Sequence, residues 1–369
     1  MRVTLSDIAD RAGVSQATVS RVLNGRPGVA AATRAAVLDA VGEQGYDGPA
    51  RTGRRPGGLV GIVVPELENP IFASFASALA SALAQHGCTP VVCTQALAGM
   101  HEDDYVRVLL DKQAAGVVFV SGQHADVSTE AGRYTALVER GLPMVLVNGH
   151  VDGVAAAFVS NDDAMAVDLA VGHLVQLGHR RIGLATGPRR YVPVLRRIDG
   201  FREALARHLP DELHAVADRA ADSSDDALER LVECTHFTVE GGVAAAGALL
   251  DRGCTAIVCG SDMLAIGAVR GARERGLRVP EDVSVVGSDD SLLMSYTDPS
   301  MTTVRQPVLA MSAAAVSALV DALAGGSPPR AEYLFQPELV VRGSTAPAPA
   351  AVEARLGRAP VAAHSQRGA

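Results

Sequence analysis

The 369-residue chain lacks most of the features that mark membrane proteins and disulfide-bonded secreted proteins. Its five cysteines are an odd number without a C-x-x-C pair, which favours buried reduced thiols over disulfides or a zinc site. No apolar run reaches the roughly 18 residues of a membrane span, and the N-terminus has no basic segment followed by an apolar one, as a signal peptide would. We therefore expect a cytoplasmic protein, associated with the nucleoid if it binds DNA.

Motifs of enzyme chemistry are missing as well. No G-x-S-x-G, Walker loop or G-x-G-x-x-G lies at a strand–helix junction, so nothing points to catalysis. His101-Glu102 lacks a second histidine at the zincin spacing, and we interpret His173 and His179, which flank a helix, as structural. We predict neither a metal site nor a cofactor.

Net positive charge is confined to the N-terminal part of the chain. Lys112 is the only lysine, which we attribute to genome composition. Residues 1–58 hold eight arginines against five acidic residues, whereas the whole chain has a net charge of −8, so the remainder is strongly acidic. A mildly basic head on an acidic body is typical of a DNA-binding module joined to a sensor domain.

The stretch TLSDIADRAGVSQATVSRVLN, residues 4–24, has the pattern of two short helices joined by a tight turn. Thr4 and Asp7 form a start like a capping box, and apolar residues follow at helical spacing. Gly13 can adopt the left-handed turn that ends the first helix, and Ser15 can cap a second helix that runs to about Leu23. The pattern predicts a helix-turn-helix, whose second helix enters the DNA major groove.

The polar face of the second helix offers groups for both kinds of DNA contact. Gln16 can hydrogen-bond to base edges and Arg21 suits guanine, while the hydroxyl and amide side chains suit phosphate oxygens. An ordinary helical hairpin with a solvated face would show the same pattern, so both interpretations stay open at this point. The candidate DNA-binding residues are Thr4, Ser15, Gln16, Ala17, Thr18, Ser20, Arg21 and Asn24, with Arg51, Arg54 and Arg55 of the following linker as phosphate contacts.

Beyond the turn-forming linker, short apolar runs alternate with amphipathic segments in two successive series. The runs predict strands at residues 59–65, 89–95, 116–122, 143–149, 157–162, 180–187, 255–262 and 284–290. Such alternation predicts an α/β body with two lobes, each built on a doubly wound parallel sheet. Ligands of these sheets bind beyond the carboxyl ends of the strands, so the residues just after the strands are candidates.

Four of these strand-end residues could instead be no more than helix N-caps. They are Ser121, Ser261, Asp262 and Asp289. For any one of them alone the cap interpretation is favoured. Their convergence at one end of both sheets is what favours a ligand pocket.

Residues 4–24, continued by Val29, Thr33-Arg34, Val37 and Gly45-Tyr46, resemble the DNA-binding headpiece of the LacI/GalR family of bacterial repressors. In the body, the segments NPIF (69–72), HLVQLGHRRIGLATGP (173–188), GLRVPEDVSVVGSDD (276–290), MTTVRQP (301–307) and PELVVRGST (337–345) look like signatures of the same family. The resemblance implies a three-helix headpiece and a body similar to the periplasmic sugar-binding proteins. It also implies a homodimer on a roughly palindromic operator.

The resemblance also assigns effector contacts by motif. Arg197 matches the arginine that holds effector hydroxyls or carboxylate, and Asp289 matches an acid that accepts hydrogen bonds from the effector. Taken without the family, Arg197 could be a surface arginine, with Arg196 as its solvated neighbour. The complete effector-binding set is Phe72, Ser121, Asn148, Tyr191, Arg197, Ser261, Asp262 and Asp289.

The linker departs from the family pattern. Gly53 stands where the family has a leucine that wedges into the minor groove, and Pro56-Gly57-Gly58 oppose a helix. We therefore do not expect the leucine wedge here. Whether the shortened linker forms a hinge helix is left open by the sequence.

We predict the following organisation. The headpiece spans residues 1–48, the atypical linker 49–58, the body 59–345 and a disordered tail 346–369. The first lobe takes residues 59–160 and 291–325, and the second lobe takes 161–290 and 326–345. An apolar stripe, Ile71, Phe72, Phe75, Ala76, Leu79 and Leu83, serves either a dimer interface or, more simply, the core of the lobe.

The predicted function is that of a sequence-specific transcription regulator, a repressor, whose operator affinity is controlled by a small effector such as a sugar or a related metabolite. The alternative is a soluble sugar-binding protein without a DNA role, and a Rossmann enzyme is disfavoured by the missing phosphate loop. The few aromatic residues weaken the case for a hexose without excluding it. Neither the effector nor the direction of its effect can be read from the sequence.

Overall fold

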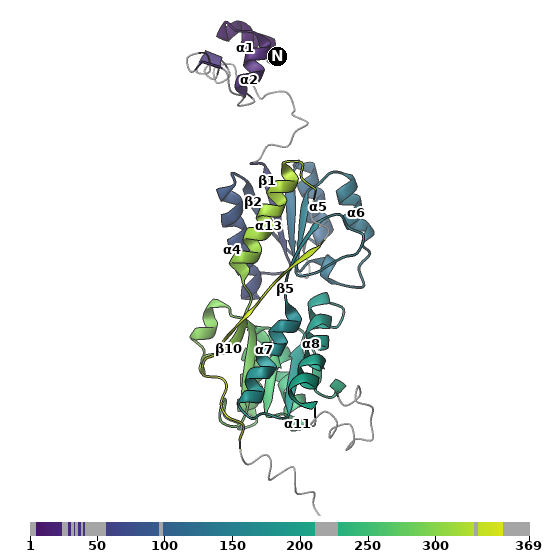
Figure 1. Cartoon of the computed structure of the whole chain (residues 1–369), viewed down its shortest axis with the longest axis vertical. Helices are drawn as coiled ribbons and strands as arrows, with labels where there is room; N and C mark the ends of the chain where they lie inside the picture. Colours follow the sequence, from purple (N-terminus) through teal and green to yellow (C-terminus); the bar gives the residue numbers. More distant parts are fainter. Residues whose placement is uncertain are drawn as a thin grey trace, which may run out of the picture. The chain divides into compact units, whose positions relative to one another are not determined.

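The computed structural model describes residues 5–23, 29–30, 33, 36–37, 40, 57–95, 99–210, 228–327 and 331–349. The chain forms two compact units, Met1–Arg55 and Pro56–Ala369 (Figure 1). Several predicted elements lie outside the described residues. They are Thr4, Asn24, most of the third headpiece helix, the linker arginines and the tail from residue 350 onward.

The first unit contains the predicted helix-turn-helix, made of α1 (Leu5–Ala12) and α2 (Gln16–Leu23). Gly13 has φ +65°, the left-handed conformation that ends α1. The Ser15 Oγ accepts a hydrogen bond of 3.1 Å from the Thr18 N–H, so Ser15 caps α2 as predicted. The helices close over a small core that consists of Ala9, Val19, Val22, Val37 and Ala40.

The second unit contains two six-stranded sheets. The first has the strand order β11-β5-β4-β3-β1-β2 and the second β12-β10-β9-β8-β6-β7. The strands of the first sheet are β1 (Leu59–Val64), β2 (Thr89–Thr94), β3 (Gly116–Val120), β4 (Met144–Val147), β5 (Ala157–Asn161) and β11 (Glu332–Phe335). Those of the second are β6 (Ile182–Thr186), β7 (Val232–Cys234), β8 (Ala256–Cys259), β9 (Ser284–Asp289), β10 (Thr302–Arg305) and β12 (Glu338–Val340).

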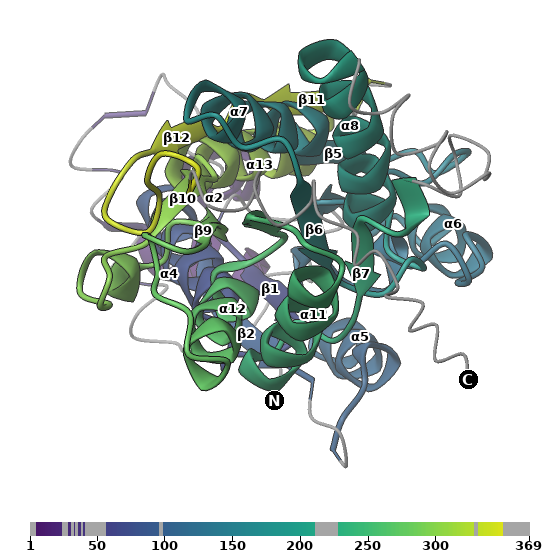
Figure 2. The ribbon, with the colours of Figure 1, turned by 90° about the horizontal axis from the view of Figure 1, so that it is seen from below.

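Helices cover both faces of each sheet, which explains why the strands are continuous apolar runs. Along β3, Val118 and Val120 face one core while Val117 and Phe119 face the other. In the first lobe α4 (Pro70–Gln85) and α13 (Val308–Leu323) lie on one face, and α5 (Glu102–Asp111) and α6 (Gly132–Glu139) on the other (Figure 1). In the second lobe α7 (Asp163–Gln176) pairs with α8 (Val192–His208), and α11 (Val239–Asp251) with α12 (Asp262–Glu274) (Figure 2). The predicted doubly wound α/β class is confirmed.

The predicted division between the lobes is wrong in two places. Residues 302–305 form β10, which pairs in parallel with β9 of the second sheet, so the return to the first lobe comes after β10 and not at residue 291. Residues 332–335 form β11, which pairs with β5 of the first sheet. Of the two described strands after α13, only β12 joins the second sheet, and it runs antiparallel to β10.

Within the described residues, the chain therefore passes between the sheets three times, after β5, after β10 and after β11. Residues 162, 306–307 and 336–337 make these crossings. The Asp162 N–H donates to the Phe335 carbonyl oxygen at 2.9 Å, so the crossing after β5 is hydrogen-bonded to the last residue of β11, just before another crossing.

Two further predictions are resolved by burial. Ile71, Phe75, Ala76, Leu79 and Leu83 are buried in the first lobe, so the stripe on α4 is core. Of the five cysteines, all free, only Cys234 is exposed.

The start of the predicted disordered tail is ordered. The Ala346 carbonyl oxygen lies 3.1 Å from the Nε2 of buried His179, and the Ala348 N–H donates to the Leu177 carbonyl oxygen at 2.8 Å. Residues 346–349 thus continue the second lobe because their backbone groups are paired with it.

Glycine is required where α11 and α12 approach each other. A Cβ added at Gly267 would lie 2.1 Å from the Val239 carbonyl oxygen and 2.7 Å from the Gly242 Cα. Gly267→Ala should therefore destabilise the body by about 1–3 kcal/mol, because the two backbones must separate. Thermal unfolding checks this against Gly132→Ala, where no atom lies within 4 Å of the added Cβ and no loss of stability is expected.

Candidate functional site

The N-terminal end of α2 carries the candidate DNA contacts that the structure describes. Ser15 and Gln16 are exposed and Thr18 is half-buried. The first turn of α2 has no acidic residue, so the positive end of the helix dipole is available for a phosphate. The side chains of Ala17, Ser20 and Arg21 lie outside the described part, and their contacts remain predictions, as do those of Thr4, Asn24 and the linker arginines.

The carboxyl ends of the strands carry unusual backbone conformations. Four of the five described non-glycine residues with positive φ are Ser121 (47°), Asn148 (61°), Asp289 (110°) and Asp290 (54°). Each of them ends or follows a strand. Such conformations cost free energy and concentrate at ligand sites, which supports a functional assignment of this edge.

Arg197 is at the centre of a buried polar cluster. Its Nε donates to the Asp163 Oδ1 at 3.0 Å, and one terminal nitrogen donates to the Gly260 carbonyl oxygen at 2.7 Å. Only 7% of Arg197 is exposed, so it is not a surface arginine. Arg196 is not a free solvated neighbour either, because it pairs with Glu332 of β11 at 2.7 Å.

Asp262 is the first residue of α12, but its side chain does not cap the helix. Ser261 is the cap and accepts a hydrogen bond of 3.3 Å from the Leu264 N–H. The Asp262 carboxylate accepts from the Ser291 N–H and hydroxyl at 2.7 and 2.8 Å and from the Thr303 hydroxyl at 2.7 Å. Burial raises the pKa of Asp262 to about 6.

Asp289 ends β9 close to Asp262. Its Oδ1 accepts a hydrogen bond of 2.6 Å from the side-chain amide of Gln306. Burial and the neighbouring charge of Asp262 raise the pKa of Asp289 well above its usual range, although Arg197 opposes the shift. Neighbouring buried carboxyl groups with raised pKa values are common at functional sites, which makes Asp262 and Asp289 candidates for ligand contacts.

The remaining predicted effector residues differ in how directly hydrogen bonds connect them to this cluster. Parallel pairing of β3 and β4 places Ser121 beside Asn148, whose Oδ1 accepts from the Asn161 N–H at 3.4 Å. The Asn161 side chain in turn hydrogen-bonds to Asp163. Phe72 is half-buried against the core of the first lobe, and a contact between its ring and an effector remains a prediction.

Tyr191 lies at a direct contact between the lobes. It forms an isolated antiparallel bridge with Asp126, and the Val127 N–H donates to the Arg190 carbonyl oxygen at 2.8 Å. The Arg190 guanidinium lies 3.1 Å from the Asp126 carboxylate and donates to the Tyr191 hydroxyl at 2.9 Å. The loop after β3 and the start of α8 are thereby connected.

Three residues of the cluster are missing from the sequence prediction. Asp163 follows Asp162 directly after a strand, so the sequence contained a signal for it. The Asp162 Oδ1 caps α7 by accepting a backbone hydrogen bond of 2.9 Å, and Asp163 is the acid that pairs with Arg197. Asn161 ends β5 and could have been found by the strand-end rule. Gln306 had no such signal because it lies at a crossing and not after a recognised strand.

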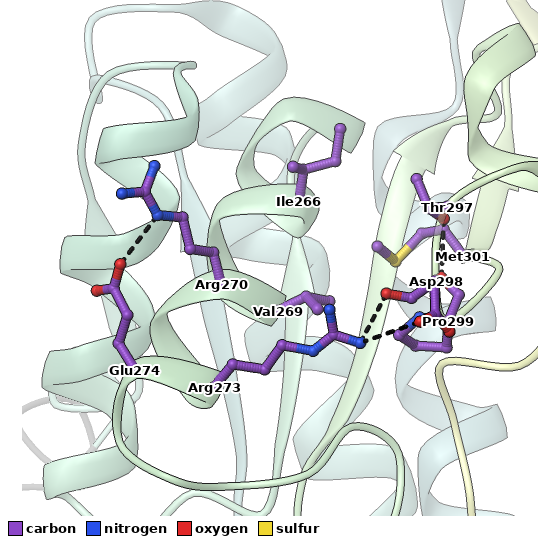
Figure 3. Close-up of a pocket in the computed structure, with 9 residues that line it drawn as sticks. All are labelled: Ile266, Val269, Arg270, Arg273, Glu274, Thr297, Asp298, Pro299 and Met301. Carbon is purple, nitrogen blue, oxygen red and sulfur yellow. Dashed lines mark hydrogen bonds and ion pairs between the residues drawn. The ribbon is translucent and has the colours of Figure 1, made fainter.

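A surface hollow of about 470 Å³ lies elsewhere on the second lobe (Figure 3). None of the predicted effector residues lines it. Ile266, Val269 and Met301 give it apolar walls, and the Arg273 guanidinium donates to the Asp298 carbonyl oxygen across it at 2.8 Å. Its chemistry suits an apolar side chain better than a polar metabolite.

Within the described ranges, no group of three or more histidine, cysteine, aspartate and glutamate side chains is arranged to hold a metal ion. In the same residues, no helix is long and apolar enough to cross a membrane.

A helix-turn-helix unit followed by a two-sheet body with a buried charged cluster at the strand ends defines a DNA-binding regulator with a ligand-binding body. Comparison with known proteins agrees. Residues 4–48 match the family model described as bacterial regulatory proteins, lacI family, and residues 171–345 match the periplasmic binding protein-like domain.

Similar proteins extend the match over nearly the whole chain. The HTH-type transcriptional regulator reg1 of Streptomyces lividans is 52% identical over 349 residues, covering 95% of this chain and 98% of its own. MalR of Streptomyces coelicolor is also 52% identical over 349 residues, with the same coverage. The chain belongs to the LacI family of bacterial regulatory proteins and is a DNA-binding transcription regulator.

Solved structures show the same architecture. The lac repressor dimer bound to operator and an anti-inducer aligns with a TM-score of 0.69 at 27% identity, covering 94% of this chain and 100% of that one. The complex of the regulator CelR with cellobiose aligns with a TM-score of 0.64 at 33% identity, covering 93% and 100%.

Proposed function

We propose that the protein is a repressor that binds a roughly palindromic operator as a homodimer, and that a sugar or related small metabolite bound at the Arg197–Asp289 cluster sets its operator affinity. The observation that carries the proposal is the position of that cluster beside the crossings between the two sheets. Arg197 holds Asp163 just after one crossing, and Asp289 holds Gln306 within another. A ligand at these side chains would act on the segments that join the lobes.

The relatives support the same assignment. The lac repressor structure contains operator DNA and the CelR structure contains a sugar. The named relatives are transcription regulators, and we propose that this chain likewise has no enzymatic activity.

A gel shift with genomic fragments from around the gene tests the DNA role. A specific complex that survives random competitor DNA and changes in the presence of candidate metabolites is the expected result. A protein that shows no preference for any duplex, with or without metabolites, would instead be a sugar-binding protein without a DNA role.

The helix-turn-helix and the linker arginines should contribute differently to operator binding. Gln16→Ala and Arg21→Ala should relax base preference, with about 1–3 kcal/mol lost on the specific site. Replacing Arg51, Arg54 and Arg55 should weaken binding to all sequences and reduce the slope of affinity against salt by about one unit for each phosphate that is no longer neutralised. Affinities measured over a salt series on specific and random duplexes separate the two effects, and equal changes in slope would contradict this division.

The second lobe offers a better dimer surface than α4. Leu292 is 80% exposed, Leu293 59% and Tyr296 79%, all in or next to the short helix η2 (Leu292–Ser295). The apolar hollow of Figure 3 lies between α12 and the residues just after η2. Large exposed apolar side chains next to an apolar hollow are typical of protein interfaces, and we propose that two copies meet here.

A further inference from the structure

Glu102 is a buried acid of the first lobe that the proposed function does not use. It is the first residue of α5, where a charged side chain ordinarily faces water, yet it is 0% exposed. Its Oε1 accepts a hydrogen bond of 2.6 Å from the Tyr134 hydroxyl of α6, and the Arg133 guanidinium lies 3.7 Å from the same oxygen. Burial raises the pKa of Glu102, although its hydrogen-bond donors and the arginine oppose the shift.

The second carboxylate oxygen holds the loop that follows β3. The Oε2 accepts a hydrogen bond of 3.0 Å from the backbone N–H of Gln123. A Cβ added at Gly122 would clash with this oxygen, so the loop backbone lies directly against the carboxylate. Behind the loop, the Nε2 of buried His124 donates to the Val147 carbonyl oxygen at 3.0 Å. Glu102 therefore fixes one side of the loop and β4 fixes the other.

The same loop makes a contact between the lobes that lies away from the crossings. The Val127 N–H donates to the Arg190 carbonyl oxygen at 2.8 Å, and the Arg190 guanidinium lies 3.1 Å from the Asp126 carboxylate. Since β4 separates β3 from β5, the loop follows a strand that is two strand spacings, about 10 Å, from the strand before the first crossing. A bond made away from the crossings breaks when the lobes separate, so this contact favours their closed arrangement.

We propose that Glu102 is a positioning residue: by holding the Gln123 N–H, it places Val127 where the second lobe can bind it, and it thereby favours closure of the lobes. The described hydrogen bonds of its carboxylate all lie within the first lobe, so its effect passes through the loop. The consequence for operator binding rests on the effector control proposed above, whereas the effect on the contact between the lobes does not.

Two variants separate the reach of this side chain from its charge. Glu102→Asp keeps the carboxylate but is shorter by one CH₂ group, so the bond to the Gln123 N–H is lost. Glu102→Gln loses the charge but keeps an oxygen that can accept from the Gln123 N–H, while the Tyr134 hydroxyl can accept from the new amide nitrogen. We expect Glu102→Asp to release the loop and Glu102→Gln to hold it. A role of the charge alone would give the opposite result.

Hydrogen exchange of the full-length protein, followed by mass spectrometry, measures the loop and its contact. In Glu102→Asp, peptides of residues 122–128 should exchange at least about tenfold faster than in the wild type, and so should residues 188–194 of the second lobe. Glu102→Gln should match the wild type. Unchanged exchange of residues 188–194 in Glu102→Asp, or faster exchange there in Glu102→Gln, would overturn the inference.

Val106→Ala is the control for a general loss of stability. Val106 lies one turn further along α5 and is buried in the first-lobe core, so its truncation leaves a cavity without touching the loop. Val106→Ala should lower the melting temperature and leave the exchange of residues 188–194 as in the wild type. If it too released these residues, a weakened lobe and not the position of the loop would explain the result for Glu102→Asp.

Fluorescence anisotropy tests the consequence for operator binding. The probe is a small-molecule extract of cells that carry the gene, added to the protein and the operator fragment recovered by gel shift. The extract should change wild-type operator affinity by about 5- to 150-fold. Glu102→Asp should need at least about three times more extract for half of the effect, because fewer molecules are closed. An equal requirement would overturn the link to operator binding. A wild-type protein that ignores the extract would refute effector control, while the exchange results would still decide the role of Glu102.

Discussion

Asp289→Asn should raise the melting temperature of the protein at pH 7 and abolish the effect of the effector on operator binding. The pKa of Asp289 is higher in the folded body than in the unfolded chain, because burial and Asp262 disfavour its ionised form. An acid shifted in this direction stabilises the fold fully only below its unfolded pKa, and that stability is lost as the pH rises towards the folded pKa. At neutral pH the ionised group is a net cost, which the neutral amide removes.

The effector response should be lost because asparagine replaces one carboxyl oxygen with an amide nitrogen, which donates hydrogen bonds and cannot accept them from the effector. Asparagine also tolerates the positive φ at this position better than most residues, so the backbone need not move. Operator binding without effector should remain, since the headpiece is untouched. The measurements are thermal unfolding between pH 4 and pH 8 and anisotropy with and without effector.

Asp282→Asn is the matched control, because the pKa of Asp282 is shifted in the opposite direction to that of Asp289. The hydrogen bonds and charge of Arg278 lower the pKa of Asp282 to about 2, so its ionised form favours folding and the stabilisation is lost as the pH falls through that value. Asp282→Asn should therefore not raise the melting temperature, and it should keep the effector response. A less stable Asp289→Asn protein that still responds to the effector would place the binding acid elsewhere.

Tyr296→Asp should convert the protein into a monomer and lower operator affinity at least about 100-fold, because two headpieces on one dimer bind their half-sites as a linked pair. Tyr296 is 79% exposed and directly precedes Thr297, which lines the hollow of Figure 3, so a carboxylate introduced here would have to lose its hydration when two copies meet. Sedimentation velocity gives the assembly state, and anisotropy gives the affinity.

An equally exposed apolar residue provides the control for this experiment. Leu309 on α13 is 79% exposed, so Leu309→Asp changes the surface by a similar amount at another position. It should remain dimeric and bind operator normally. If Leu309→Asp were monomeric while Tyr296→Asp stayed dimeric, the interface would lie on the first lobe instead.

Arg197→Ala is a less direct test than Asp289→Asn. Removing Arg197 leaves the carboxylate of Asp163 buried without its cation, which costs about 3–5 kcal/mol in comparable ion pairs. A lost response in Arg197→Ala could then reflect a damaged body and not a missing ligand contact.

Most of the body could be predicted because its central strands are buried on both faces. Runs such as GVVFV and IGLAT have no polar interruption, and helical spacing resumes directly after them. Strand β7 has only three residues, Val232–Cys234, which is too short for a periodic signal. The sheet to which β10 and β11 belong could not be predicted, because periodicity reports burial and not the partner strand.

The site was predictable where a polar residue follows a strand, and less so where a crossing brings a distant residue to it. Asp262 and Asp289 are nominated by the strand-end rule, and the structure shows both accepting hydrogen bonds from residues outside their own helix or strand. Ser261 fits the cap interpretation instead. Gln306 reaches Asp289 only because β10 lies beside β9, a pairing that spacing along the chain does not reveal.

The three crossings constrain how the body can flex. Two lobes joined by a single segment can rotate in any direction relative to each other. Lobes joined by three short segments bend about one axis and resist twisting. The motion of the two lobes when a metabolite binds should therefore be a bend about one axis. A circular permutant with its new termini at Gln336 and Pro337 would still contain both sheets. Its lobes would be joined by two segments instead of three, so the motion of one lobe relative to the other would be less restricted to one axis.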